Sequence, residues 1–330
     1  MKRFLLIIAT ILAYLPAFSQ INLKDSTVQV VAYWEKGEKY NYSFESSKYS
    51  VTGTDTTWNS REKDIINIEV IDSTAQGYLL KCTTLEDLYD SKIEGVNDII
   101  AKISKVTDNI PIVIKTDIYG TFEGIANMEE YKNAILDGVQ VLKSEIDSII
   151  EKQVKDTGLD KEKENQMREY IYSAINTIMD LFKNDNYIYK SIEPITSLLY
   201  FHGAEMKIGK KYTSSNIIQN PLDPTSTLES VNEFFIYKYD TETSCTLLTN
   251  KLVYNPEQLK QGLAVMMKNM LPPQERETKE IDVPDINMEF YTYLYINTDS
   301  GWPIYGQNEQ ITTSDGIKKI TSFEMTLIME

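Results

Sequence analysis

The feature that most constrains the fold is an apolar stripe in the middle of the chain. Between residues 128 and 150, and again between 167 and 182, apolar residues recur at steps of three and four, which places them on one side of a helix. The first segment predicts a helix of about 27 residues, or about 40 Å. Gly158 and Asp160 then supply a stop and a start, so the pattern predicts a long helical hairpin. The stripe consists of Met128, Tyr131, Ile135, Val139, Leu142, Ile146, Ile149 and Ile150, then Met167, Ile171, Ala174, Ile175, Ile178 and Phe182.

The segments on either side of this hairpin are typical of strands. Short alternating or apolar runs such as "KYNYSFESS", "DIINIEVID" and "EFFIYKYDT" are separated by turn-forming residues. Each region contains one predicted helix, residues 92–106 in the first and 255–270 in the second, where Asn255 is a good N-cap. Both regions also share an order: a Gly-x-Lys-Tyr strand, a Cys-bearing strand, a helix, and a strand that ends in Thr-Asp before a turn.

A fold class follows from the need to cover the apolar stripe. Antiparallel sheets with one apolar face are the available partners for the hairpin. The sequence therefore predicts an α+β protein in which two related antiparallel β-regions, or one large curved sheet, pack against a central long helical hairpin. The predicted divisions are a signal peptide at 1–19, a β-rich region at 20–127, the hairpin and a following helix at 128–203, and a second β-rich region at 204–330. Residues 20–330 are expected to form one compact unit.

The N-terminus reads as a secretory signal peptide. A basic start, Lys2-Arg3, precedes the apolar run "FLLIIATILAYLPAF" and the small residues Ala17 and Ser19. The apolar run has about 15 residues, and a membrane-spanning helix needs about 20. We therefore expect an exported protein, periplasmic or at the cell surface, that begins at Gln20 and has no transmembrane segment after signal removal.

The charge balance excludes some partners. Removing Lys2 and Arg3 leaves 31 basic against 49 acidic residues, a net charge of −18. Nucleic acids and anionic membrane surfaces attract clusters of Lys and Arg. Neither is expected as a partner of so acidic a chain.

Several stretches give the chain a resemblance to a known group of proteins. The signal peptide ending in "FSQ", the tyrosine-rich strands, the start "WEKGEKYNYSF" and the turn "TDSGWP" resemble uncharacterised secreted proteins of Bacteroidetes-type bacteria. The resemblance implies that the protein is exported. It implies no particular activity, because none is established for that group. A curved antiparallel sheet covered by helices is also loosely similar in architecture to the periplasmic lipoprotein-carrier fold. Three short sequences resemble the O-glycosylation sequon of those bacteria, with acceptors at Ser26, Thr56 and Ser73.

The two cysteines, Cys82 and Cys245, allow two interpretations. An oxidising compartment permits a disulfide, which would be worth about 5 kcal/mol for so long a loop. The alternative is two buried thiols on separate strands. We favour the second interpretation, because pairing cannot be derived from sequence.

Catalytic and metal-binding patterns do not stand out. The sequence has no nucleophile elbow, P-loop, His-Glu-x-x-His, Cys-x-x-Cys or dinucleotide-binding glycine pattern. The single histidine, His202, follows an apolar run and is typical of a structural residue. The sequence thus predicts no catalytic residue, no metal site and no cofactor, and it favours a non-catalytic protein.

Tyrosine is abundant, with 22 residues in 330. In "MEFYTYLYIN" the alternation places Tyr291, Tyr293 and Tyr295 on one face of a strand and aliphatic residues on the other. Tyr237 and Tyr239 are expected to share a face on another strand, and Trp58 is a further exposed aromatic candidate. A ring with a hydroxyl suits a site for a sugar, peptide or amphiphile, although such residues also simply favour strands.

Three functional hypotheses remain. The first is an exported, non-catalytic binding protein for an amphiphilic or glycan ligand or an envelope partner. The second is a secreted hydrolase that uses a carboxylate pair, since 49 acidic residues always leave that open. The third is a structural partner in a surface assembly.

Overall fold

A computed structural model describes residues 21–22, 25–91, 110–140, 143, 161–220, 222–270 and 282–329. The predicted signal peptide, the predicted helix at 92–106 and most of residues 141–160 lie outside these ranges. The predicted division of the chain at 127 and 203 is not tested by the structure.

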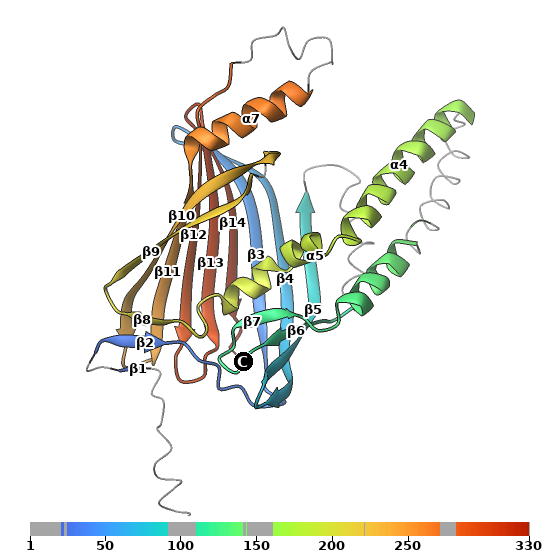
Figure 1. The fold of residues 1–330 in the computed structure, drawn as a ribbon. Coiled ribbons are helices and arrows are strands. Elements are labelled where there is room, and N and C mark those ends of the chain that lie inside the picture. The colour runs from blue at the N-terminus through green and yellow to red at the C-terminus, as the bar shows by residue number, and fades with distance from the viewer. Residues whose placement is uncertain are drawn as a thin grey trace, which may run out of the picture.

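The described chain is built around one antiparallel sheet of eleven strands (Figure 1). Its two halves are joined where β3 and β14 pair, with Thr52 opposite Ile317 and Tyr42 opposite Leu327. The early and late β-regions therefore belong to one continuous sheet. In spatial order the strands are β7 (Phe122–Ile125), β6 (Ile112–Thr116), β5 (Gly77–Ser91), β4 (Asp55–Thr74), β3 (Lys39–Thr52), β14 (Ile317–Leu327), β13 (Pro303–Ser314), β12 (Ile286–Asn297), β11 (Cys245–Tyr254), β10 (Asp223–Asp240) and β9 (Lys211–Asn220).

The predicted α+β fold with a central helical hairpin is wrong, because the protein is mostly β. In the described part of the chain no long helical hairpin packs against the sheet. Helix α4 (Lys161–Phe182) begins and ends close to where its spacing predicts, but its described contacts are with α5 (Asp185–Ser191) and with Gln140 and Lys143, and none of these lies on the sheet. Figure 1 shows α4 extending away from the sheet. An apolar stripe predicts that a segment is helical, but it does not predict which surface the helix packs against.

One face of the sheet carries the core, and we call it the inner face. Alternation in each strand directs every second side chain there, as with Tyr42 and Phe44 in β3, which are almost completely buried. Across the sheet, Ile68, Leu248 and Leu294 lie on the same face. The short elements after α4 cover this face. They are α5, α6 (Glu193–Thr196) and the 3-10 helix η1 (Ser197–Leu199), which contribute Ile188, Ile192, Leu198 and Leu199 to the core.

A second, three-stranded sheet closes one end of this core. It consists of β1 (Ile21–Asn22), β2 (Thr27–Gln29) and β8 (Glu205–Lys207). Beyond β2 the chain places Trp34 against Trp302, with ring centroids 4.7 Å apart. Both indoles are buried, so Trp34 and Trp302 are core residues.

The remaining helix, α7 (Pro256–Met270), matches its sequence signals. Asn255 Oδ1 accepts hydrogen bonds from the N–H groups of Glu257 and Gln258, as expected of an N-cap. It packs on β10 and β12 and also contacts Asn220 of β9, and Leu259 is fully buried.

The matching Gly-x-Lys-Tyr sequences have the same local geometry. Gly37 and Gly209 both have positive φ, and each donates its N–H to the neighbouring strand, to Val70 and Ile236 respectively, at 2.8 and 2.9 Å. In each copy a β-bulge follows that acceptor residue. The shared order in the sequence therefore reflects a shared way of entering the sheet.

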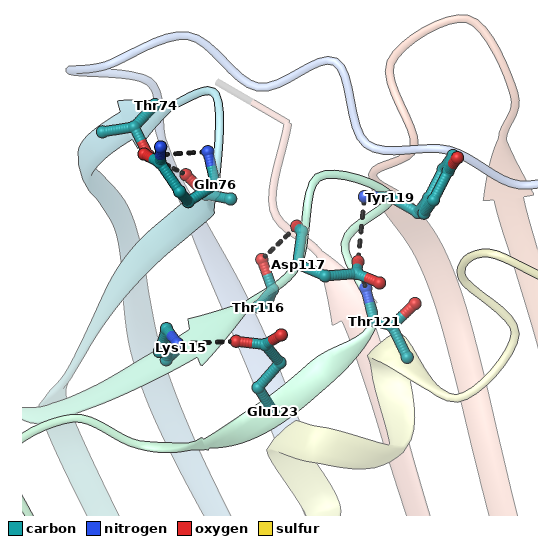
Figure 2. A network of polar contacts seen from close by, with 9 residues as sticks. Thr74, Gln76, Lys115, Thr116, Asp117, Tyr119, Thr121 and Glu123 are labelled. Atoms are coloured by element: carbon teal, nitrogen blue, oxygen red, sulfur yellow. Dashed lines mark hydrogen bonds and ion pairs between the residues drawn. The ribbon is translucent and has the colours of Figure 1, made fainter.

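The Thr-Asp turns correspond less directly than the sequence indicates. Asp117 Oδ1 accepts the N–H groups of Tyr119 and Thr121 at 2.9 and 2.8 Å (Figure 2). In the later turn the equivalent acceptor is Asn297, whose Oδ1 accepts the N–H groups of Asp299 and Ser300. The structural match of Asp117 is therefore Asn297 and not Asp299.

The two cysteines lie far apart in the sheet. Cys82 lies on β5 and Cys245 on β11, and strands β4, β3, β14, β13 and β12 separate them. Both are buried free thiols.

Candidate functional site

His202 is placed as a structural residue. Its Nε2 atom lies 2.8 Å from the carbonyl oxygen of Gly301, so Nε2 carries the proton and donates it. Burial lowers the pKa of His202 to about 4, although the bond to Gly301 opposes this. The ring also lies against Trp34, with centroids 5.5 Å apart. A buried neutral imidazole that donates to a main-chain carbonyl is a structural residue, as the sequence predicts for His202.

Within the described ranges, no three His, Cys, Asp or Glu residues are grouped closely enough to hold a metal ion. The same ranges contain no helix with both the length and the apolar character needed to cross a membrane.

The predicted tyrosines of β12 lie on the face opposite the core, which we call the outer face. Leu294 and Ile296 are buried on the inner side, whereas Tyr291, Tyr293 and Tyr295 are half-buried and lie outside the core cluster. Because the strand is regular over these residues, alternation alone places them correctly.

Register extends this surface over three neighbouring strands. Tyr293 lies opposite Thr249 of β11 and Gln307 of β13, and Thr249 in turn lies opposite Phe235 of β10. Opposite residues in an antiparallel sheet share a face. We define the tyrosine face as the outer-face aromatic residues Phe235, Tyr237, Tyr291, Tyr293, Tyr295 and Tyr305 with their neighbours Lys251, Gln307 and Glu309.

The aromatic rings of this face form a platform. The rings of Tyr291 and Tyr293 are almost parallel, at 5°, with centroids 6.5 Å apart. Phe235 and Tyr237 meet edge to face at 4.7 Å, and the Tyr237 side chain is 59% exposed. Tyr295 is held at the end of the row by a 3.2 Å hydrogen bond between its hydroxyl and that of Thr243.

A polar row on β13 runs beside the tyrosines. The Tyr305 hydroxyl donates to Gln307 Oε1 at 3.3 Å, and Gln307 Nε2 donates to Glu309 Oε1 at 3.2 Å. Burial and the Glu309 carboxylate raise the pKa of Tyr293. At physiological pH its hydroxyl is therefore protonated and can donate a hydrogen bond.

A cation completes the surface. Lys251 Nζ lies 2.8 Å from Glu289 Oε1 and 5.2 Å from the centroid of the Tyr291 ring. The hydrogen bond to Glu289, followed by that to Tyr291, raises the pKa of Lys251. The face therefore offers charged and neutral hydrogen-bonding groups around an apolar centre.

The other predicted residues are divided between the two faces. Tyr237 belongs to the tyrosine face, but the prediction that Tyr239 shares its face is wrong. A β-bulge between Ile236 and Lys238 inserts one extra residue, so Tyr239 pairs with Thr246 and is directed to the inner face. Trp58 is 46% exposed on the outer face but lies on β4, against Tyr49 and Arg61, away from the tyrosine face.

Sequence reasoning missed Tyr305, Gln307, Glu309 and Lys251. The segment 303–314 contains a proline, a glycine and many polar residues, and it shows no clear alternation. These residues become part of the site only through register with β12, a non-local property.

The proposed O-glycosylation acceptors all lie at the surface. Ser26 and Thr56 are in exposed turn and hairpin positions. Ser73 is also exposed, and its hydroxyl donates to the Trp34 carbonyl at 3.2 Å.

Two hollows lie on the inner face beside η1. One includes Leu198, Leu294 and Asn308 in its lining. The other lies among apolar residues that include Ile68, Leu80 and Leu199. The side chains around both hollows are packed too closely to admit a ligand.

Comparisons with known proteins place few limits on identity. No family model matches the chain, and no curated protein matches it. Among solved structures, one described as "Lipid-protein interactions in lipovitellin" has 8% sequence identity and a TM-score of 0.36. That similarity covers 89% of this chain and 25% of the lipovitellin chain, so the present chain spans about a quarter of that protein. The fold and site together define a mostly β protein with an aromatic platform on the outer face of its sheet.

Proposed function

We propose that this is an exported, non-catalytic binding protein whose tyrosine face takes a glycan. The observation that carries the proposal is the parallel pair of Tyr291 and Tyr293 rings. A pyranose ring has an apolar face of C–H groups that can lie on an aromatic ring, and its hydroxyls need polar partners at the edge of that contact.

The surroundings of the ring pair supply those partners. Glu309 and Gln307 offer acceptors on one side, opposite Tyr291 and Tyr293. Lys251 offers a donor on the other side, opposite Tyr291. This arrangement is more suitable for a sugar than for the alkyl chain of an amphiphile, which needs an enclosed apolar volume.

The experiment is a titration of the mature protein with soluble oligosaccharides from the producing cell's own envelope, followed by calorimetry and tyrosine fluorescence. We expect saturable binding that the Tyr293→Ala variant weakens by about fivefold or more, because one stacked ring contributes about 1 kcal/mol or more. The double variant Tyr291→Ala/Tyr293→Ala should abolish it.

Tyr119→Ala is the matched control. Tyr119 is 43% exposed in the turn after β6, and its N–H bond to Asp117 survives the substitution. Binding that persists in the double variant, or that Tyr119→Ala reduces equally, would refute the site. Binding of fatty acids or detergent that is insensitive to both variants would instead favour an amphiphile on the inner face.

A further inference from the structure

The geometry points to a second function of the sheet: we propose that strand β9 pairs antiparallel with β9 of a second copy, so that two chains form one continuous sheet. The inference is independent of the glycan proposal. It begins from the position of β9 as the last strand of the eleven-stranded sheet, where, in the described part of the chain, its backbone ladder is formed with β10 alone (Figure 1).

The direction of the main-chain groups of β9 follows from the ladder. Asn255 N–H donates to the Glu229 carbonyl, so Glu229 is directed toward β11 and Ser230 toward β9. Ser230 lies opposite Asn216, which is therefore directed toward β10. Successive residues of a strand point their N–H and C=O groups to opposite sides. The outward groups consequently belong to residues Lys211, Thr213, Ser215, Ile217 and Gln219.

This edge lacks the features that normally prevent strand pairing. From Tyr212 to Asn220 the strand has no charge and no proline. Residues 213–218 are exposed, and the side chain of Ile217 is 71% exposed. Exposed edges in monomers are usually interrupted by lysine, proline or a bulge. An exposed edge of nine residues without charge or proline is instead typical of a pairing site.

The strand is complementary to itself. When two copies of β9 run antiparallel about a twofold axis at Ser215, Ser215 faces its own copy, Thr213 faces Ile217, and Lys211 faces Gln219. No like charges lie opposite each other, and every pair consists of residues whose N–H and C=O groups point outward. Mature chains with a net charge of −18 repel each other at long range, so an uncharged edge is the place where two copies can approach.

The other edges of the sheet favour a closed pair over a filament. Strand β7 has only four residues, and Glu123 within it forms an ion pair with Lys115 at 2.8 Å. The part of β5 beyond β6, residues 83–91, carries Glu86, Asp87 and Asp90. Because β9 is the one long, uncharged edge strand among the described strands of this sheet, pairing is isologous and ends at two copies.

The test is analytical ultracentrifugation of the whole protein without its predicted signal peptide, over a range of concentrations. We expect a reversible dimer that is strengthened by added salt, because salt screens the repulsion between the acidic chains. A protein that stays monomeric at every concentration and salt level would overturn the proposal.

Variants at Ser215 locate the interface. Ser215→Pro removes an N–H that points outward, so the bonds to β10 remain while two symmetry-related bonds of the dimer are lost. We expect dimerisation about thirtyfold weaker. Thr326→Lys, an exposed position in the middle of the sheet on β14, should leave the dimer unchanged.

A charge exchange tests the twofold axis itself. Ser215→Lys and Ser215→Glu should each be monomeric, because each would place like charges opposite each other, and circular dichroism should show that each is folded. Mixed in equal amounts, they should form a heterodimer. A mixture of folded variants that remains monomeric, or a dimer that neither single variant weakens, would refute the axis at Ser215.

Discussion

The Nε2 atom of His202 lies 2.8 Å from the carbonyl oxygen of Gly301, and this bond joins the segment before β8 to the turn between β12 and β13. Gly120 packs against the same imidazole. A Cβ atom at this position would lie only 2.7 Å from His202 Cδ2, so a larger residue does not fit. Two glycine turns from opposite parts of the sheet therefore meet at one histidine.

This arrangement predicts a loss of stability in mild acid. The unfolded histidine titrates near its usual pKa of about 6.5, whereas the folded one titrates at about 4. Between these values the unfolded state binds a proton that the folded state does not, so the free energy of unfolding decreases as pH falls from about 6.5 to 4. The stabilisation that depends on a neutral His202 is fully present above about pH 6.5 and amounts to about 3 kcal/mol.

Urea denaturation at a series of pH values measures this effect. The His202→Gln variant is the comparison, because its amide can still donate to Gly301 but does not titrate. The difference in unfolding free energy between the two proteins should change with pH only in that window, since carboxylates contribute equally to both. Parallel curves from pH 7 to 4 would show that His202 is not buried as a neutral group.

The turn at Gly301 predicts a steric effect that can be separated from backbone strain. A Cβ atom there would lie 2.5 Å from the Val31 carbonyl oxygen, and φ is +76°. Gly316 has φ of +77° but nothing within 4 Å of its Cβ position. Gly316→Ala should cost about 1 kcal/mol of stability from strain alone, and Gly301→Ala about 2 to 4 kcal/mol more. Equal losses in thermal or urea unfolding would contradict the close packing of this turn.

The buried hydroxyl of Tyr42 predicts a smaller effect. It donates to the Pro303 carbonyl at 3.1 Å, and the residue is completely buried on the inner face. Tyr42→Phe keeps the packing and removes the donor, so the unfolding free energy should fall by about 1 to 2 kcal/mol. Tyr119→Phe, in an exposed turn, should change it by less than about 0.5 kcal/mol. A stabilised Tyr42→Phe protein would mean that the bond is not formed.

The sequence predicts the features of this fold that depend on neighbouring residues, but not those that depend on pairing between distant segments. Local signals succeed: the Asn255 cap and Pro256 define α7, and alternation separates Tyr293 from Leu294. The joining of the halves through β3 and β14 depends on pairing between residues such as Thr52 and Ile317. No periodicity within either strand contains that information, and the predicted hairpin core arose from assuming that the sheet must cover the central stripe.

The residues of the tyrosine face were likewise predictable from the sequence only where local alternation decides the direction of a side chain. Tyr291, Tyr293 and Tyr295 could be assigned to one face because β12 is regular, whereas the bulge next to Tyr237 reverses the direction of Tyr239 without altering the alternating sequence. The polar row of Tyr305, Gln307 and Glu309 depends on register alone.

The two cysteines predict an unreactive, reduced protein while the fold persists. Burial raises the pKa of Cys82 to about 12, so at pH 8 only about one thiol in ten thousand is ionised. Cys245 is 1% exposed, and its thiol donates to the Thr243 carbonyl at 3.2 Å. Iodoacetamide should therefore label neither residue in the native protein and both in urea without reductant, as counted by mass spectrometry. Labelling in urea that requires prior reduction would reveal a disulfide, which would require strands β5 and β11 to lie next to each other and would contradict the strand order of the sheet.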